Sequence, residues 1–544
     1  MRPIAILSLF AGFVLGPGAT AGDSPKEVDQ VFMAYAKSGS PGCALGVVQD
    51  GNFVYRKGFG LASLELGVPL SSQSVFYMGS VSKQFTAASV VLAAEQGFLS
   101  LDDNVRKFLP ELPDYGHPIT LRQMLHHTSG LRDFLTLLGL AGREAGEIHS
   151  EAEIIDLIAR QKNLNSIPGE EWLYSNTNYF LLGVVVKRAT KKSLAEFAAE
   201  NIFKPLEMAH TRFYDDHTVV LAGRAAAYDA GKNGDFLVDW STDYDIVGAG
   251  GLMSTVDDML LWDRNFYANT LGKGTLLKEL QTRGVLNNGK QIGYALGLQL
   301  DSYRGLPVVE HDGALYGYRT GILRFPEQKF SVICLCNVSS AGVANLSRRV
   351  ADIYLRGVLG AEEDAPQTAS TGNLPDVREF AGKYLDPRKH FVYTFTASGG
   401  NLAAWGASLR RIGPNQFKDL GTGTITFEGS GSNKKATLEM DGEAFFAGRR
   451  VETPHRNDQE LAGYAGQYRS EELGASYRFS VEGGDLVLRR NWDPPLPLTA
   501  LTQNEFECSD LGATIVFEKD ASNRVRGLRV YEVNARDIKF VKVK

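Results

Sequence analysis

The spacing of apolar residues divides the chain into regions of different expected structure. Residues 43–49 and 53–58 are strand-like runs joined by Asp50-Gly51, a strong hairpin signal. Residues 80–97 have apolar positions at helical spacing and little polar face, which predicts a helix buried in the centre of a domain. Helical and loop-like patterns then continue to about residue 265.

Strand-like runs return after this helical stretch. They are the segments 295–300, 308–312, 319–325 and 331–337, and a helix follows with Val343, Leu346, Val350 and Ile353 on one face. Strands therefore lie at both ends of this region and helices in its middle. We expect one mostly antiparallel sheet assembled from both ends, with helices packed on it and a helical lobe inserted.

The pattern changes again beyond residues 361–375, a small and polar stretch without periodicity that predicts a linker. Short alternating strands follow, and they repeat. Phe380-Ala381-Gly382-Lys383-Tyr384 matches Tyr464-Ala465-Gly466-Gln467-Tyr468, 84 positions later (468 − 384), and later matches show a five-residue insertion in the second copy. Each copy is long enough for about eight short strands. We expect two small all-β, barrel-like domains at 376–452 and 458–544.

The first 21 residues have the three parts of a signal peptide. Arg2 begins a short basic segment, residues 4–15 are apolar, and Ala19-Thr20-Ala21 is a small-residue cleavage site. We expect cleavage near Ala21 and a periplasmic or secreted protein. No other stretch approaches spanning length, so the mature chain is expected to lack a transmembrane segment.

Charge and cysteine usage narrow the classes of function. A net charge of −6 over 544 residues, without a Lys/Arg run, argues against nucleic acid as a partner. The four cysteines are too few for a disulfide scaffold, although Cys43 or Cys508 could pair with Cys334 or Cys336. No Cys/His spacing indicates zinc, so we expect neither a metal nor a cofactor.

Candidate chemistry begins with Ser80 and Lys83, which lie three apart on one helix face. Burial would push the lysine toward its neutral form, in which it can take the proton of the serine hydroxyl. Ser-x-x-Lys is a weak signal alone, because it recurs at Ser432 and Lys435 in a turn-like run.

Two further motifs supply possible partners. Tyr174 and Asn176 form a Tyr-x-Asn motif, which recurs at Tyr267 and Asn269 and is equally weak alone. His311-Asp312-Gly313 ends a strand-like run, so the histidine could orient the tyrosine hydroxyl or share its proton, and Gly313 would let a substrate lie against the strand. The alternatives, His126 and His127, fit the end of a structural helix better.

Taken as an ordered set, Gly79-Ser80-Val81-Ser82-Lys83, Tyr174-Ser175-Asn176 and His311-Asp312-Gly313 resemble the penicillin-binding-protein and class C β-lactamase family of serine hydrolases. The resemblance covers roughly residues 25 to 360. It implies that residues 22–360 form an α/β (α+β) domain with a central antiparallel sheet and a helical lobe.

The same resemblance assigns roles to individual residues. It implies Ser80 as the acylated nucleophile, Lys83 and Tyr174 as proton-transfer partners, Asn176 as the contact to substrate and lysine, and His311 where many members have lysine. It also implies an oxyanion hole made by the N–H groups of Ser80 and Ala314.

The arrangement of the whole chain resembles the D-aminopeptidases of this family. We therefore expect an aminopeptidase or amidase acting on small peptides, amides or esters; an esterase, D,D-peptidase or β-lactamase of the family is the alternative, and a receptor that binds without turnover is an alternative of another class. Asp312 is expected to favour a free ammonium in the substrate unless it pairs with Arg319 instead. Trp492, in the segment of the second repeat that carries the insertion, is expected near Ser80.

Overall fold

The computed structural model describes residues 24–143, 147–239, 245–361, 374–404, 407–418, 423–440, 443–490 and 493–543. The expected signal peptide and most of the expected linker lie outside these ranges. Within them, none of the helices combines the length and apolar character that crossing a bilayer requires.

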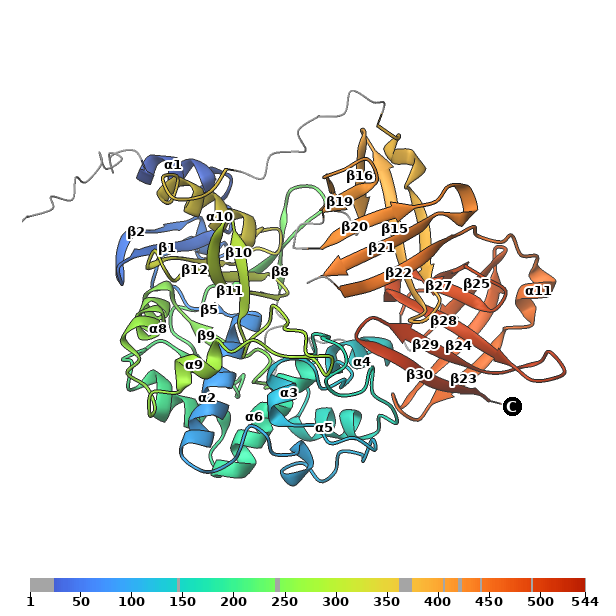
Figure 1. Ribbon diagram of the computed structural model, residues 1–544, viewed down its shortest axis with the longest axis horizontal. Helices are drawn as coiled ribbons and strands as arrows, with labels where there is room; N and C mark the ends of the chain where they lie inside the picture. The colour runs from blue at the N-terminus through green and yellow to red at the C-terminus, as the bar shows by residue number, and fades with distance from the viewer. Residues whose placement is uncertain are drawn as a thin grey trace, which may run out of the picture.

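The catalytic candidates lie in a domain built on one six-stranded antiparallel sheet with the order β10-β11-β12-β13-β1-β2 (Figure 1). Its strands are β1 (Cys43–Gln49), β2 (Asn52–Phe59), β10 (Gln299–Tyr303), β11 (Leu306–Leu315), β12 (Tyr318–Phe325) and β13 (Phe330–Cys336). The first strand, β1, pairs directly with β13, the last of the later group, and β2 pairs with β1. The expected assembly of the sheet from both ends of the domain is therefore confirmed.

Local details of the sheet follow from the sequence, with one exception. Asp50 and Gly51 have φ values of 49° and 72°, as a tight hairpin between β1 and β2 requires. The segment 295–300 is not a strand over most of its length, because β10 begins at Gln299. Ala295 and Leu296 are apolar because they are buried in the core as a loop.

Helices cover both faces of this sheet. The helices α1 (Ser24–Val31) and α10 (Val343–Tyr354) cover one face, and α2 (Lys83–Glu95) and α8 (Val256–Ala268) pack in the core on the other. The inserted lobe comprises α3 (Leu121–Leu125), α4 (Phe134–Leu140), α5 (Glu151–Ala159), α6 (Asn176–Thr190), α7 (Leu194–Ala198) and α9 (Leu276–Leu280). Short strands complete the domain: β3 (Leu61–Ser63), β4 (Val68–Pro69), β5 (Phe76–Tyr77), β6 (Arg212–Phe213), β7 (Ala227–Ala230), β8 (Phe236–Asp239) and β9 (Leu252–Ser254).

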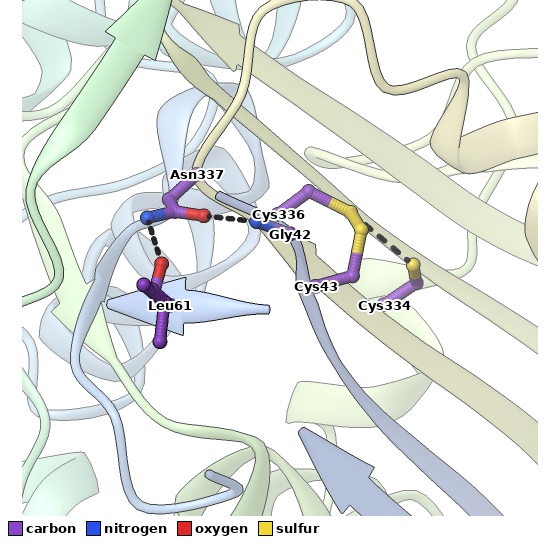
Figure 2. Close-up of a disulfide and its surroundings, with 6 residues drawn as sticks. All are labelled: Gly42, Cys43, Leu61, Cys334, Cys336 and Asn337. Carbon is purple, nitrogen blue, oxygen red and sulfur yellow. Dashed lines mark hydrogen bonds between the residues drawn. A yellow bond between two sulfur atoms is a disulfide. The ribbon is translucent and has the colours of Figure 1, made fainter. Parts of the chain in front are cut away.

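A disulfide joins the two sequence-distant halves of the sheet (Figure 2). Cys43 on β1 and Cys336 on β13 are register partners and are bonded to each other, while the Cys334 sulfur lies 3.7 Å from that of Cys336. Just beyond the disulfide, Asn337 accepts from the Gly42 N–H and donates to the Leu61 carbonyl. The bond closes a loop with a sequence separation of 293.

Two β domains follow, as expected. The first is a nine-stranded sheet, β17-β16-β15-β14-β22-β21-β20-β19-β18, and the second is a closed barrel of β23 to β30. The first contains β14 (Gly382–Asp386), β15 (Phe391–Ser398), β16 (Asn401–Ala404), β17 (Ala407–Ser408), β18 (Arg410–Arg411), β19 (Gln416–Lys418), β20 (Thr424–Glu428), β21 (Lys435–Met440) and β22 (Glu443–Val451). After α11 (Asp458–Ala462), the barrel contains β23 (Gly466–Ser470), β24 (Ala475–Glu482), β25 (Asp485–Arg489), β26 (Leu496–Ala500), β27 (Glu505–Cys508), β28 (Ala513–Lys519), β29 (Val525–Glu532) and β30 (Ala535–Lys542).

Equivalent tyrosines make the same contact in both β domains. The Tyr384 hydroxyl donates to the Phe380 carbonyl, and the Tyr468 hydroxyl donates to the Tyr464 carbonyl. Both tyrosines are fully buried in aromatic cores. The repeat read from the sequence is therefore a repeat of structure.

Candidate active site

The structure brings Ser80, Lys83 and Asn176 into direct contact. Ser80 lies in a 3₁₀ turn, Gly79–Ser82, that leads into α2, and Lys83 is the first residue of that helix. The Lys83 Nζ lies 3.0 Å from Ser80 Oγ, 2.9 Å from Asn176 Oδ1 and 2.7 Å from the Ala249 carbonyl oxygen. The Lys83 amino group is thus surrounded by three oxygen atoms, one of which belongs to the candidate nucleophile.

Burial changes the acid–base chemistry of Lys83. The side chain is completely buried, and this loss of solvation lowers the lysine pKa to about 7, partly offset by the negative charge of Asp133. A lysine with this pKa is substantially neutral at neutral pH. It is then able to accept a proton from the hydroxyl group that it contacts.

Tyr174 lies over the same lysine. Its ring centroid is 4.8 Å from Lys83 Nζ. Burial raises the pKa of the Tyr174 hydroxyl, and a hydrogen bond with Ser80 opposes this rise. Tyr174 therefore remains a neutral phenol that contacts the serine.

Close packing of backbone places the end of β11 against the turn that holds Ser80. Gly79 has a φ of 53°, and a Cβ at this position would lie 2.8 Å from the Ala314 nitrogen and 3.0 Å from the Gly313 Cα. Gly313 is equally crowded, since a Cβ there would lie 2.1 Å from the Met78 carbonyl oxygen. Two glycines are needed for this approach, and they bring the Ala314 N–H beside the serine turn.

His311 reaches this region but bonds to a different tyrosine from the one expected. Its Nε2 lies 3.0 Å from the Tyr294 hydroxyl, and its Nδ1 lies 2.7 Å from the Asp312 carbonyl oxygen. Because a carbonyl only accepts, Nδ1 carries the proton and Nε2 accepts from Tyr294. Burial, followed by the positive charge of Lys83, lowers the His311 pKa to about 4. The imidazole is therefore neutral, and its ring centroid lies 6.4 Å from that of Tyr174.

Asp312 is not brought to this site. Neighbouring residues of a strand point to opposite faces, and Asp312 points toward α10: a Cβ on Gly321 would lie 2.7 Å from its Oδ1 and 3.5 Å from Val343. Asp312 is solvent-exposed, but the protein around it and the Glu310 carboxylate raise its pKa to about 6. Asp312 therefore lies on the opposite face of the strand from His311, away from the position in which it was expected to select a substrate ammonium.

The expected alternative partner of Asp312 is not its partner either. The Arg319 guanidinium donates to the Tyr316 and Tyr318 carbonyls. The cation whose charge acts on Asp312 is Arg348.

Asp133 is a site residue that no sequence pattern indicated, and His127, which the sequence placed at the end of a structural helix, also lies at the site. Asp133 is buried beside Lys83, caps α4, and accepts a 2.5 Å hydrogen bond from the Asn176 N–H. His127 stacks on Tyr174 with centroids 4.3 Å apart, and its Nδ1 accepts from the Ser175 N–H. Asp133 is recognisable as a helix cap, but its burial beside a lysine is visible only in the fold.

The remaining candidates fall elsewhere. Trp492 lies outside the described residues. Arg490, two positions before it, donates to the Gly139 and Leu140 carbonyls at the end of α4. Ser432 and Lys435 are exposed in the first β domain, and Asn269 caps the end of α8. His126 is buried with a pKa lowered to about 4, as suits a structural residue.

One group in the described ranges has the spacing of a metal site. The sulfurs of Cys43, Cys334 and Cys336 lie within 4.8 Å of one another. Two of the three are bonded as a disulfide, so a single thiol remains, and this is too few ligands for a structural metal.

The chain belongs to the beta-lactamase family, whose model matches residues 28–355. A buried lysine beside a serine is the arrangement that the motifs of the sequence predicted, and the enzyme is a serine hydrolase of this family.

Similarity extends beyond the matched domain. The chain is 26% identical over 524 residues to the D-aminopeptidase of Brucella melitensis biotype 2, covering 92% of this chain and 95% of that protein. Among solved structures, the octameric penicillin-binding protein homologue from Pyrococcus abyssi has a TM-score of 0.56 at 20% identity, over 87% of this chain and 99% of that one. The D-amino acid amidase from Ochrobactrum anthropi SV3 has a TM-score of 0.53 at 22% identity, over 62% of this chain and 99% of that one. These two structures share the fold.

Proposed function

We propose that this serine hydrolase is an exported aminopeptidase or amidase that cleaves the amide bond following an N-terminal D-amino acid, through an acyl-enzyme on Ser80. The observation that carries the proposal is the contact between a neutral, buried Lys83 and the Ser80 hydroxyl. Similarity to a D-aminopeptidase over nearly the whole chain, β domains included, supports the substrate class.

The first half of the reaction uses the groups that surround Ser80. As Ser80 Oγ attacks the substrate carbonyl carbon, its proton passes to neutral Lys83 Nζ, and a C–O bond forms. The N–H groups of Ser80 and Ala314 stabilise the resulting oxyanion. The C–N bond then breaks, and the departing amine takes a proton delivered by Lys83 through the Tyr174 hydroxyl.

The second half regenerates the enzyme. Water attacks the ester carbonyl and gives one proton to the same relay, and the C–O bond to Ser80 breaks as Oγ regains a proton. The products are the free D-amino acid and the amine. Asn176 and His311 act by position: Asn176 orients the lysine, and neutral His311 fixes Tyr294 beneath the site.

A panel of substrates tests this proposal. D-alanyl p-nitroanilide is expected to turn over faster than its L-alanyl and N-acetyl-D-alanyl forms, than a D-Ala-D-Ala peptide and than a β-lactam. A preference for p-nitrophenyl acetate, for the D-Ala-D-Ala peptide or for the β-lactam would instead indicate the esterase, D,D-peptidase or β-lactamase. A single burst equivalent without turnover of any substrate would indicate a receptor.

Export is tested separately. Expression of the full chain followed by cell fractionation should place the protein outside the cytoplasm, with an N-terminus near Gly22. A cytoplasmic protein that retains residues 1–21 would contradict this part of the proposal.

A further inference from the structure

A continuous path of hydrogen bonds joins the last barrel to the candidate nucleophile. The Asn534 carbonyl, between β29 and β30, accepts from the Asp133 N–H at 2.9 Å. Asp133 Oδ2 accepts from the Asn176 N–H at 2.5 Å, and Asn176 Oδ1 accepts from Lys83 Nζ at 2.9 Å. The last step is the 3.0 Å contact of Lys83 Nζ with Ser80 Oγ. Every link in this path is a direct hydrogen bond between two residues of the chain.

The residue that precedes Asp133 is anchored in the same barrel. Arg132 forms a 2.6 Å ion pair with Glu472, and the two side chains are 0% and 4% exposed. Arg132 also donates to Gln161 Oε1 and to the Asp537 carbonyl, each at 3.0 Å. A fully buried guanidinium that is paired in this way holds its backbone in one place. The barrel therefore makes direct contacts with both Arg132 and Asp133.

Further hydrogen bonds hold the β29–β30 hairpin against the loop that leads to Tyr174 and Asn176. Asn165 Nδ2 donates to the Asn534 carbonyl at 2.8 Å, and Asn165 Oδ1 accepts from the Arg536 N–H at 2.8 Å. The Arg536 guanidinium binds both carboxylate oxygens of Glu171, at 2.8 and 3.1 Å. These contacts join the barrel to the segment that leads to Tyr174 and Asn176.

We propose that the last barrel positions the catalytic lysine, with Glu472 and the Asn534 carbonyl acting on Lys83 through Arg132, Asp133 and Asn176. The proposal rests on the acyl-enzyme role proposed for Ser80 and goes beyond it, because it assigns the distant barrel a part in activating the nucleophile. Glu472 and Asn534 are positioning residues that do not touch the substrate in this scheme.

The groups around Lys83 make Asp133 the one that transmits the effect. The described side chains that act on or face Lys83 are Ser80, Asn176, His127, His311, Tyr174, Tyr179 and Asp133. Of these, Asp133 supplies a carboxylate, and it is the group that favours the charged form of Lys83. Burial raises the pKa of Asp133, and the N–H groups of Thr136 and Asn176, which donate to its two oxygens, oppose this rise. Glu532 of the barrel faces Asp133 in turn.

The test measures acylation of Ser80 by p-nitrophenyl acetate, a reaction that needs no D-amino acid specificity. The variants are Glu472→Gln, Asn165→Ala as a milder change, and Asp133→Asn. Glu507→Gln is the matched control, because Glu507 on the same barrel pairs with Lys383 of the first β domain and not with the catalytic domain. Rate constants are expressed per active site, counted from the burst, and are measured from pH 5 to 9.

Both barrel-contact variants are expected to lower the acylation rate constant by on the order of 10- to 100-fold with little change in KM, because small displacements of a catalytic group cost this much. The pH midpoint of acylation should fall in both variants, because the Asp133 carboxylate, which favours protonation of Lys83, is displaced. It should also fall in Asp133→Asn, in which that carboxylate is removed. In the Asp133→Asn background, Glu472→Gln should cause little further loss. The control should match the wild type.

Three outcomes would overturn the inference: unchanged acylation per site in both contact variants, an unshifted pH midpoint, or fully additive losses with Asp133→Asn. If Glu472→Gln does not fold, Asn165→Ala decides the matter. A wild-type enzyme that is not acylated at all would instead overturn the proposed function, and the inference would fall with it.

Discussion

The two β domains come from one sequence repeat, yet they hold the catalytic domain in different ways. In each, the turn between the first two strands faces that domain, at residues 387–390 in the first repeat and 471–474 in the second. From the first turn, Lys389 reaches Glu171 at 2.7 Å; from the second, Glu472 reaches Arg132 at 2.6 Å. The same turn of the repeat therefore carries opposite charge at the contact and reaches a different target.

Burial and redundancy separate the two contacts. The Lys389 and Glu171 side chains remain 21% and 22% exposed, and Glu171 is also paired with Arg536. The Arg132–Glu472 pair is almost fully buried and lies one residue from Asp133. A common fold thus preserves the position of the turn, while the two contacts differ in burial and in their distance along the chain from Asp133.

Removal of the proposed nucleophile should cause the largest loss of turnover. Ser80→Ala and Lys83→Ala are each expected to lower turnover of D-alanyl p-nitroanilide by more than about 10⁴-fold, and the double variant should be little worse, because the two residues act as a unit. The matched control is Ser432→Ala, which removes the serine of the second, exposed Ser-x-x-Lys motif. Substantial activity in Ser80→Ala, with loss in Ser432→Ala, would show that the site is assigned wrongly.

Glu472→Gln should produce the largest loss of stability among the interdomain contacts. It leaves the buried Arg132 guanidinium without its anionic partner, so we expect the free energy of unfolding to fall by about 3–5 kcal/mol. Urea denaturation followed by circular dichroism measures this change, with Glu507→Gln as the control. A loss no greater than that of the control would mean that the buried turn is no more important than an ordinary contact.

The disulfide offers a second contrast, because the described cysteine pair ties the catalytic domain and not the β domains. Cys43→Ala opens the loop that links β1 to β13 and should cost about 2–5 kcal/mol. In thermal unfolding, reductant should lower the stability of the wild type by a similar amount and leave Cys43→Ala unchanged. Cys508→Ala removes a free buried thiol of the barrel and keeps the disulfide, so it should lose stability on reduction as the wild type does. Sensitivity of Cys43→Ala to reductant would contradict the assignment of the bond.

Lys389→Met should have the smallest effect. Its partner Glu171 keeps the bidentate contact with Arg536, and the lost pair is partly solvated, so we expect a change below about 1 kcal/mol. The measurement is urea denaturation beside Glu472→Gln. Equal losses in the two variants would remove the distinction between the two turns.

Much of the candidate active site follows from local sequence. Ser80 and Lys83 share a helix face, and the glycines at 79 and 313 mark the places where backbones approach closely. Strand alternation also accounts for the position of Asp312: if His311 faces the site on an extended strand, the next residue faces away. The expectation that both side chains share one pocket is inconsistent with this alternation.

Other features depend on contacts between residues far apart in the chain. Asp133 can be recognised as a helix cap, but its approach to Lys83 requires α4 and α6 to pack with α2. Glu472 and Asn534 lie more than 300 residues from Asp133, and no local pattern links them. The apolar run at residues 295–298 predicts a strand but forms a buried loop, because burial alone makes a short segment apolar.

The pH dependence of Ser80 acylation tests the central claim, that a neutral Lys83 activates the serine. Acylation by a D-alanyl ester is followed before the steady state, with the adduct located by mass spectrometry. Lys83 is neutral above its pKa, so the rate should rise about tenfold per pH unit below the midpoint and level off above about pH 7, with the adduct on the peptide that contains Ser80. A midpoint near pH 4, where His311 titrates, or an adduct on another residue, would contradict the account.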